Sequence, residues 1–473
     1  MTFEFQRWMN NLLIRMSKSP RVDGSQSPAE SWHLRMMQEA SQLLAGGLTP
    51  ARLTELSRDG NGFVREGALR ALIEYPSVGA LQAITERLND WVPTVRRAAQ
   101  QAFDTYLEQP HVHLLLRCLD DVVQLETRHR DDHAALLQRV GVVLSQGALR
   151  AQACTALLQL RGRASRYLFR VLYAADPDAR CELVAQAMSH DDLTVRSLAL
   201  QQLADVLDEG AAPLLTTAFG DPVPALRSRA LGMLLSQHGT DGERQQWTER
   251  GAVDRSAGVR GLARWYAGKS QIDLSPLRNR LDSQPHRPAT ETIALLELNE
   301  AAGVVNLRLL EASLAHPFAT VRIAALGCVV RQAPQLAASA LRRALLDPSS
   351  KVFRLASDMV RKLNVGVTAE DVLDACMEAL AQQEMQRAVA VATLLPLWLQ
   401  LDALLRCYGK VPSTEGMDAL CKWESRQAKA YWIKPATGES ARIRARWAEL
   451  QSRQLAPGLP RLLFALRQFG LAD

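Results

Sequence analysis

A short residue pattern returns along the chain at nearly constant spacing, and this repetition limits the possible folds more than any other sequence feature. The pattern is Asp, four further residues, Val or Leu, Arg, two further residues and Ala. Five copies carry it, one of them with Phe353 in place of Arg, and two more lack the Asp at its position. One of these two has Asp191 and Asp192 nearby, and the other has His316 followed by Pro317. The Val or Leu of the seven copies stands at Val64, Val95, Val195, Leu226, Val259, Val321 and Val352.

The spacing between copies defines a unit of about 31 residues. Neighbouring copies are separated by 31 residues in three cases and by 33 in a fourth, and the 62 residues between Val259 and Val321 equal two periods. The missing copy would fall near 290–294, where the pattern has decayed, and the 100 residues between Val95 and Val195 would hold about three divergent units. The chain is therefore predicted to be an array of short units.

Each position of the pattern has a physical role. Val and Ala lie four residues apart and share one buried helix face, and the small Ala lets a neighbouring helix approach closely. The Asp before the helix is expected to accept hydrogen bonds from free N–H groups. The Arg is expected at an exposed edge, within reach of the Asp of an adjacent unit. A second helix follows after a break, for example at Pro76 or Pro110. Two short helices cannot bury their own apolar faces, so the units are predicted to stack.

This pattern resembles the HEAT-repeat family, specifically the short HEAT-like repeats first described in phycobilisome lyases. The resemblance covers about residues 50–365 and implies an all-α fold, a right-handed α-solenoid of stacked helix pairs. The same repeats serve scaffolds, adaptors, lyases and a class of DNA glycosylases, so several functions are compatible with it. We expect each copy to form a helix that buries its Ala, over residues 64–72, 95–103, 195–203, 226–234, 259–267, 321–329 and 352–360.

Residues 1–28 are predicted to form an amphipathic helix and a linker ahead of the repeats. Apolar side chains recur at helical spacing. The segment lacks the basic stretch and uninterrupted apolar core of a signal peptide, so none is predicted. The helix is expected to fold back and cap the first repeat. Docking into a partner's groove and lying on a membrane surface are the alternatives, the latter disfavoured by the small number of basic residues. The predicted docking stripe consists of Phe5, Trp8, Met9 and Leu12.

The repeat array is predicted to span residues 29–405, and residues 406–473 to form a basic helical C-terminal region without the pattern. Between Lys422 and Arg446, seven basic and two acidic residues leave a balance of +5. Basic side chains bind acidic proteins or neutralise phosphates, and interleaved aromatic rings can stack on bases. The predicted partner-binding or anion-binding residues are Lys422, Arg426, Lys429, Lys434, Arg442, Arg444, Arg446 and Trp432.

A secondary basic face is predicted at Arg163, Arg166 and Arg170, which share one helix face at i, i+3 and i+7. Signatures of catalysis are lacking: the chain has no phosphate-binding glycine loop, no G-x-S-x-G elbow and no H-E-x-x-H. His129 and His133 are spaced like metal ligands on a helix, but zinc requires three or four convergent ligands. No catalytic residue, cofactor or metal site is therefore predicted.

Composition indicates the cellular compartment and shows how far the positive charge can be used to infer a partner. The seven Cys form no C-x-x-C pair, which is typical of reduced core thiols and predicts a cytoplasmic protein. The chain contains no run of ~18 apolar residues, so no transmembrane span is predicted. The net charge is +6, with 48 Arg against 8 Lys, and a GC-rich genome produces the same Arg bias. Arginine content alone therefore does not indicate nucleic-acid binding.

The sequence as a whole predicts a non-enzymatic HEAT-repeat scaffold or adaptor. It would bind a protein partner through its groove and its basic C-terminal helices. One alternative is a nucleic-acid-binding HEAT-repeat protein, with a DNA glycosylase as one form of it. Another is an enzyme like the chromophore lyases. A nucleic-acid binder should lose affinity steeply with salt, and an enzyme should have a pocket with a shifted carboxylate.

Overall fold

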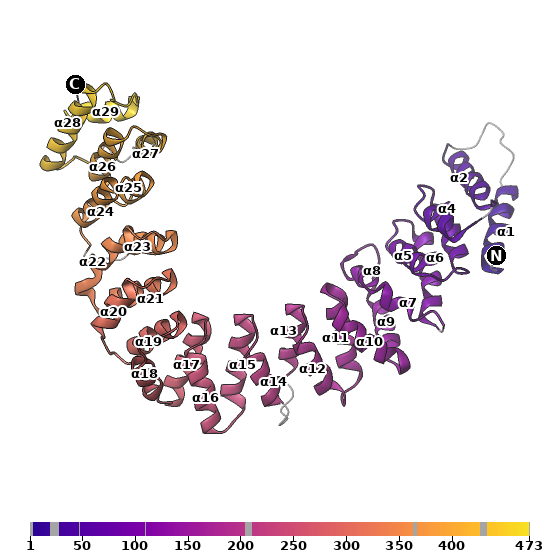
Figure 1. The fold of residues 1–473 in the computed structure, drawn as a ribbon. Coiled ribbons are helices and arrows are strands. Elements are labelled where there is room, and N and C mark those ends of the chain that lie inside the picture. The colour runs from indigo at the N-terminus through magenta and orange to yellow at the C-terminus, as the bar shows by residue number, and fades with distance from the viewer. Residues whose placement is uncertain are drawn as a thin grey trace. The chain divides into compact units, whose positions relative to one another are not determined.

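A computed structural model describes residues 3–18, 28–46, 48–108, 110–203, 211–362, 367–425 and 433–472, leaving out the side chains at 3–5, 16–18 and 28–31. These described residues form α-helices joined by short turns, with two short 3-10 segments and no strand (Figure 1). The predicted all-α class is confirmed. The chain divides into two compact units, unit 1 at Met1–Leu234 and unit 2 at Leu235–Asp473.

Unit 1 begins with α1 (Phe3–Lys18), which packs on α2 and α4. Its last helix, α15 (Pro224–Gln237), continues into unit 2. The other elements of unit 1 are α2 (Pro28–Leu44), α3 (Pro50–Leu56), α4 (Gly62–Leu72), α5 (Val78–Arg87), α6 (Pro93–Asp104), η1 (Thr105–Leu107), α7 (Leu114–Arg117), α8 (Leu119–Val123), η2 (Gln124–Thr127), α9 (Ala134–Leu144), α10 (Gly147–Gln159), α11 (Gly162–Ala175), α12 (Arg180–Met188), α13 (Leu193–Gln202) and α14 (Ala211–Ala218).

The helices of unit 1 lie in two layers. In one layer α2 packs on α4 and α4 on α6, and farther along the chain α9 packs on α11 and α11 on α13. In the other layer α3 packs on α5, α5 on α7 and α8, α10 on α12, and α12 on α14. Helices adjacent in the chain pack across the layers, as α3 does on α4. Each pair therefore buries its apolar faces against the next pair, which is the architecture of a solenoid.

Unit 2 contains the remaining helices. They are α16 (Asp241–Ala252), α17 (Ala257–Ser270), α18 (Ser275–Asp282), α19 (Ala289–Ala301), α20 (Leu307–Leu314), α21 (Ala319–Gln332), α22 (Pro334–Leu345), α23 (Ser350–Lys362), α24 (Ala369–Ala381), α25 (Met385–Ala392), α26 (Leu397–Lys410), α27 (Thr414–Ser425), α28 (Thr437–Ser452) and α29 (Pro460–Gln468). One layer stacks α17, α19, α21 and α23, with α25 on α27, and the other stacks α22, α24, α26 and α28. Stacking therefore continues after the sequence pattern has ended.

The seven copies of the pattern mark helix starts, as predicted. In every case the helix begins two residues before the Val or Leu, and the predicted spans are helical, apart from position 203, which caps α13. The missing copy near 290–294 is also present as α19, where Ala294 is buried. All seven Ala side chains are fully buried: Ala68, Ala99, Ala199, Ala230, Ala263, Ala325 and Ala356.

The Arg of the pattern is not at an exposed edge, and this expectation was wrong. Arg65, Arg227 and Arg260 are buried, and the other pattern arginines are half-buried. Each guanidinium is drawn inward because it bonds the turn that precedes its own helix. A bond of 2.7 or 2.8 Å joins Nη1 to the carbonyl oxygen six residues earlier, from Arg65 to Asp59, Arg96 to Asp90, Arg196 to His190, Arg227 to Asp221, Arg260 to Asp254 and Arg322 to His316.

The predicted reach to the Asp of an adjacent unit is confirmed. Guanidinium–carboxylate distances are 2.9 Å for Arg65–Asp90, 2.8 Å for Arg196–Asp221 and 2.7 Å for Arg322–Asp347. One Arg side chain therefore holds the turn of its own unit and the carboxylate of the next.

The pattern Asp closes a turn with its carboxylate. Asp90 accepts a hydrogen bond from the N–H of Val92 at 2.9 Å, two residues onward. The bonded N–H belongs to the residue before the helix, so the carboxylate orders the turn and not the first helical turn itself. In the two copies without Asp, His190 and His316 take over: Nδ1 of each accepts the N–H two residues onward, at 2.8 and 3.1 Å. The turn therefore survives the substitution.

The buried Ala positions give a stability prediction. Ala325→Glu should lower the free energy of unfolding by about 3 kcal/mol or more, because it forces an unpaired carboxylate between packed helices. Ala312→Glu is the matched control, since Ala312 is exposed on the preceding helix. Urea unfolding followed by circular dichroism measures both; equal stability of the two variants would contradict the assigned packing.

The Arg–Asp pairs predict acid sensitivity. Burial alone would raise the pKa of Asp347, but hydrogen bonds from Arg322 and from the N–H of Ser349 outweigh it and hold this pKa below its usual value. A lowered pKa adds stability above the ordinary value of about 3.8, and this stability is lost as the pH falls through the lowered pKa. Asp347→Asn should therefore reduce stability at pH 7 and weaken its decline below about pH 4. Urea unfolding at several pH values tests this, with exposed Asp282→Asn as control.

Candidate functional site

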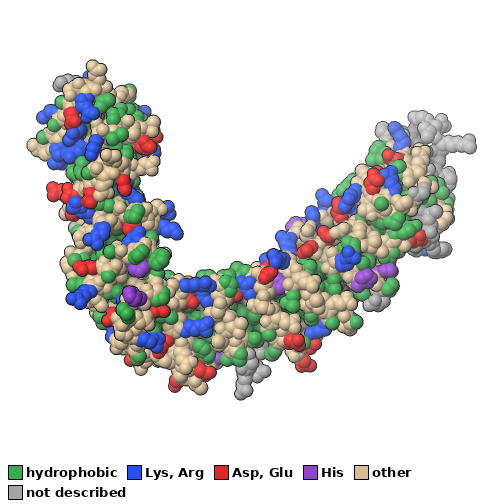
Figure 2. Space-filling view, viewed as in Figure 1, with side chains coloured by type: hydrophobic (Ala, Val, Ile, Leu, Met, Phe, Trp, Pro, Cys, Tyr) green, Lys and Arg blue, Asp and Glu red, His purple; other side chains and the backbone are tan. Residues whose placement is uncertain are grey.

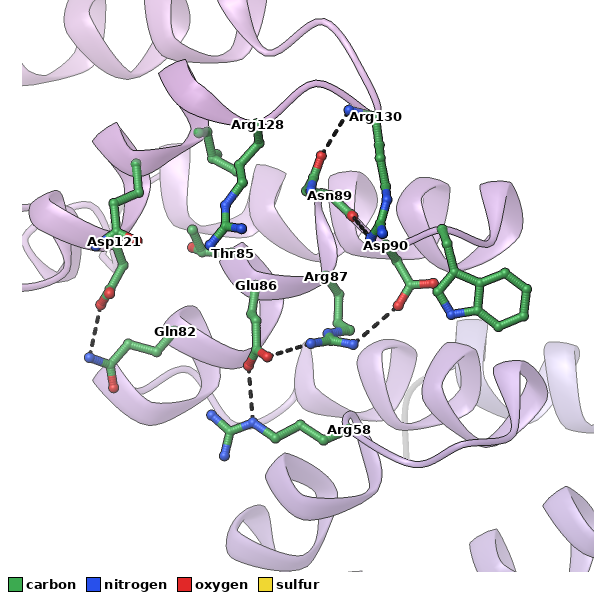
Figure 3. A pocket seen from close by; sticks show the side chains of 13 residues that line it. Arg58, Gln82, Thr85, Glu86, Arg87, Asn89, Asp90, Asp121, Arg128 and Arg130 are labelled. Atoms are coloured by element: carbon green, nitrogen blue, oxygen red, sulfur yellow. Dashed lines mark hydrogen bonds and ion pairs between the residues drawn. The ribbon is translucent and has the colours of Figure 1, made fainter. Parts of the chain in front are cut away.

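A polar pocket of about 450 Å³ lies in unit 1 between α5 and the α8–η2 segment (Figure 3). It forms where the repeat is irregular. The segments opposite α5 are only four and five residues long in α7 and α8, so loops and not a full helix close this side. The lining residues are Arg58, Gln82, Thr85, Glu86, Arg87, Asn89, Asp90, Trp91, Asp121, Gln124, Leu125, Arg128 and Arg130.

Two carboxylates fix part of the pocket wall. Glu86 accepts hydrogen bonds from Nε of Arg58, at 3.0 Å, and from Arg87. Asp90 accepts from Arg65 at 2.9 and 3.0 Å and from Arg87 at 3.2 Å. Burial would raise the pKa of both carboxyls, but their arginine partners outweigh it and lower both values. Both therefore remain ionised and hold Arg58 and Arg87 in place.

Two other arginines of the pocket lack an acidic partner among the described residues. The Arg128 side chain makes no hydrogen bond or ion pair with any described residue. Arg130 donates from Nη1 only to a neutral acceptor, the carbonyl oxygen of Asn89, at 3.3 Å. The third lining carboxylate, Asp121, accepts from Gln82 at 3.0 Å. The exposed guanidinium groups of Arg128 and Arg130 are therefore not paired with any described carboxylate.

An aromatic ring stands beside this pocket. Trp91 follows Asp90 and is 66% exposed. The guanidinium carbon of Arg65 lies 5.3 Å from the centre of its ring, which holds the indole against the turn. An exposed Trp next to Arg is the composition found in the energetic centres of protein interfaces.

The predicted secondary basic face lies on α11, but its charges are engaged. Arg166 pairs with Asp192 at 3.1 Å and Arg170 with Glu126 at 3.1 Å, while Arg163 donates to the hydroxyl of Thr127 at 3.2 Å. The segment from Arg163 to Arg170 contains no acidic residue, but neighbouring elements supply acidic partners. A smaller hollow of about 320 Å³ beside it shares Gln124 with the arginine pocket.

Only part of the predicted C-terminal site lies among the described residues. Arg426, Lys429 and Trp432 lie outside the described residues. Lys422 on α27 and Lys434 before α28 are exposed. The three predicted arginines of α28 all have partners: Arg442 pairs with Asp402 at 3.3 Å, Arg444 donates to the carbonyl oxygen of Gly470 at 3.2 Å, and Arg446 pairs with Glu449. Figure 2 shows Lys and Arg side chains gathered over α28.

The two acidic residues of this basic stretch act at helix starts. Glu424 accepts hydrogen bonds from the first two N–H groups of α29, at 2.7 and 3.1 Å. Glu439 accepts from the N–H of Ala436 at 2.8 Å, which caps α28. Neither forms an ion pair with a basic side chain of the predicted site that the structure describes.

The aromatic rings described in this region belong to the core. Trp423 and Trp447 are buried, and Nε1 of Trp423 donates to the carbonyl oxygen of Leu397 at 2.9 Å. Trp398 is also buried and donates to the carbonyl oxygen of Ile433 at 2.7 Å. Trp398, Trp423 and Trp447 therefore do not present faces for stacking on bases.

The N-terminal stripe contacts the chain's own helices. Leu12 is buried, Trp8 and Met9 are half-buried, and the side chain of Phe5 lies outside the description. Nε1 of Trp8 donates to Glu66 on α4 at 3.0 Å. A Cβ atom at Gly67 would lie 2.7 Å from the Trp8 ring, so glycine is required for this close approach. This is the capping arrangement.

Two further properties follow from the described part of the chain. No helix there combines the length and apolarity needed to cross a membrane. Within the same residues, no three His, Cys, Asp or Glu side chains gather as a metal ion would require.

Comparison with known proteins gives structural similarities of low score only. No protein-family model and no curated protein matches the chain. Among structures, it is similar to the karyopherin Kap121p bound to the extreme C-terminus of the protein phosphatase Cdc14p, at 14% identity and a TM-score of 0.23 over 99% of this chain and 49% of that one. The chain thus spans about half the length of the karyopherin. It is also similar to a homology model of the full-length AP-3 complex, at 12% identity and a TM-score of 0.21 over 99% and 96% of the two chains. These TM-scores are too low to indicate a shared fold.

The carboxylate under α28 gives a testable prediction. Asp402 is fully buried and binds Arg406 at 3.0 Å as well as Arg442. Asp402→Ala should lower the free energy of unfolding by about 3 kcal/mol, because two guanidinium groups lose their buried anion. Asp418→Ala, at an exposed position of α27, is the control. Unchanged urea midpoints for Asp402→Ala would show that this pair does not stabilise the stacking of α26 on α28.

Proposed function

We propose that this chain is a non-enzymatic helical-repeat scaffold that binds an acidic segment of a protein partner. The observation that carries the proposal is the pocket of unit 1, where Arg128 and Arg130 have no acidic partner in the described part of the chain and lie beside the exposed Trp91. The basic surface of α27 and α28, with Lys422 and Lys434 exposed, is proposed as a second contact.

Charge distribution favours a protein over a nucleic acid as the partner. Three carboxylates, Glu86, Asp90 and Asp121, line the pocket together with its four arginines. A continuous phosphate backbone would have to pass these carboxylates, whereas a single acidic side chain can reach the guanidinium groups between them. Nucleic acid also gains affinity from stacking on exposed rings. The described Trp residues of the C-terminal region are buried and supply none.

Acid–base catalysis at this pocket has little support. A carboxylate that acts as a general acid needs a raised pKa. Those of Glu86 and Asp90 are lowered. Nucleic-acid binding remains the second candidate, because the acidic residues Glu424 and Glu439 cap helices and the exposed Lys422 and Lys434 have no acidic partner among the described residues.

The proposal is tested with three variants of the full chain: Trp91→Ala, Arg128→Gln with Arg130→Gln, and the control Arg97→Gln. Arg97 is an exposed arginine of α6 that does not line the pocket. We expect wild type and control to retain a stoichiometric protein partner on purification from native cells, and both pocket variants to lose most of it. Loss of a central Trp or Arg contact typically weakens a complex by about 2 kcal/mol, or roughly thirtyfold.

Binding of DNA and RNA over a salt series separates the alternatives. A protein partner retained equally by all variants would contradict the pocket as the contact site. Tight, steeply salt-dependent binding of nucleic acid, reduced when Lys422 and Lys434 are changed to Gln, would favour the second candidate.

A further inference from the structure

The arginine pocket offers more hydrogen-bond donors than its own acceptors use. Arg128 contributes a complete guanidinium with five N–H groups, none of them bonded within the described residues. Arg130 uses Nη1 alone. Nε of Arg87 is buried without a partner, although the rest of that guanidinium is held by Glu86 and Asp90.

A neutral donor reinforces this excess. Thr85, on α5, is only 3% exposed, and its hydroxyl has no hydrogen-bond partner among the residues that the structure describes. A buried Thr on a helix ordinarily bonds the carbonyl four residues earlier. Here that bond is not made, and Thr85 lines the same pocket as Arg128 (Figure 3). An unsatisfied buried hydroxyl is destabilising, and a bound acceptor would relieve this cost.

The charge of the wall also exceeds that of a single carboxylate. Four arginines and three carboxylates line the pocket, a balance of +1. Arg65, which bonds Asp90 from outside the lining, raises it to +2. A phosphate monoester carries a charge of about −1.5 to −2 at pH 7 and has three strong acceptor oxygens. A carboxylate carries −1 and two oxygens.

We infer that this pocket binds a phosphate monoester carried on a side chain of the protein partner, such as phosphoserine. Arg128 and Arg130 would engage the phosphoryl oxygens with charge-assisted bonds, and Thr85 would donate one more. Glu86 and Asp90 position Arg58 and Arg87 and do not touch the ligand. The inference rests on the proposed function, because it names the chemistry that the scaffold recognises.

The exposed ring beside the pocket favours a phosphorylated peptide over a free phosphate. Trp91 is 66% exposed and offers apolar area to residues that flank the modified one. A free phosphate has no part that would use this ring. Recognition of phosphorylated segments by clusters of Arg is an established mode of peptide binding.

The test uses the purified full chain and three peptide libraries, randomised around a fixed central residue that is phosphoserine, serine or glutamate. Inorganic phosphate and free phosphoserine are titrated in parallel. We expect the phosphoserine library to bind at least about tenfold more tightly than either matched library and than both small phosphates.

Variants assign the binding to this pocket. Arg128→Gln and Thr85→Val should each weaken phosphopeptide binding, Arg128→Gln by about tenfold or more, while Arg97→Gln leaves it unchanged. Thr85→Val keeps the side-chain shape and removes only an unbonded hydroxyl, so the variant should be at least as stable as wild type. Circular dichroism and urea unfolding confirm that each variant is folded.

Four results would overturn the inference. They are equal binding of the glutamate library, equal binding of free phosphate, phosphopeptide binding that persists in Arg128→Gln and Thr85→Val, and no binding of any phosphorylated probe. A failure of the phosphate inference leaves the scaffold proposal intact if the native protein partner is still lost from the Arg128→Gln, Arg130→Gln variant. Retention of that partner would instead contradict the scaffold site itself.

Discussion

The stacking of the units depends on the hydrogen bonds of the pattern Arg, a charged side chain that is drawn inward although charged side chains are usually exposed. Placing a guanidinium between packed helices is costly unless most of its donors are satisfied. In this chain the pattern Arg meets that condition by bonding the carbonyl at the start of its own turn and the carboxylate of the following unit. The carbonyl belongs to the same unit as the Arg, whereas the carboxylate lies about 25 residues away in the chain, as for Arg65 and Asp90. The same side chain therefore closes a turn and sets the register between neighbouring units.

Helix starts and buried Ala positions could be predicted from the sequence because both depend on neighbours within one helix. A Val and an Ala four residues apart share a face whatever lies beyond it. The buried location of the Arg could not be obtained in this way, since the acceptors that pull Arg65 inward include Asp90 of the next unit. The replacement of Asp by His190 could have been predicted from the sequence. It stands six residues before Arg196, which is the spacing between Asp and Arg in the complete copies.

The arginine pocket was missed for a related reason. Arg128 and Arg130 belong to a segment without the pattern, and no periodicity placed them near α5. The segment drew attention only for His129 and His133, of which His133 is buried and has a lowered pKa, mainly because of desolvation. The predicted face at Arg163, Arg166 and Arg170 shows the same dependence on distant residues. Its sequence was free of acidic residues, but Glu126 and Asp192 reach it from other elements.

Asp90 belongs both to the stacking of the units and to the pocket, because it binds Arg65 on one side and Arg87 on the other. This one carboxylate thus joins the packing of α4 on α6 to the position of Arg87 in the pocket wall, so the geometry of a junction between units and the geometry of the pocket share a single anchor.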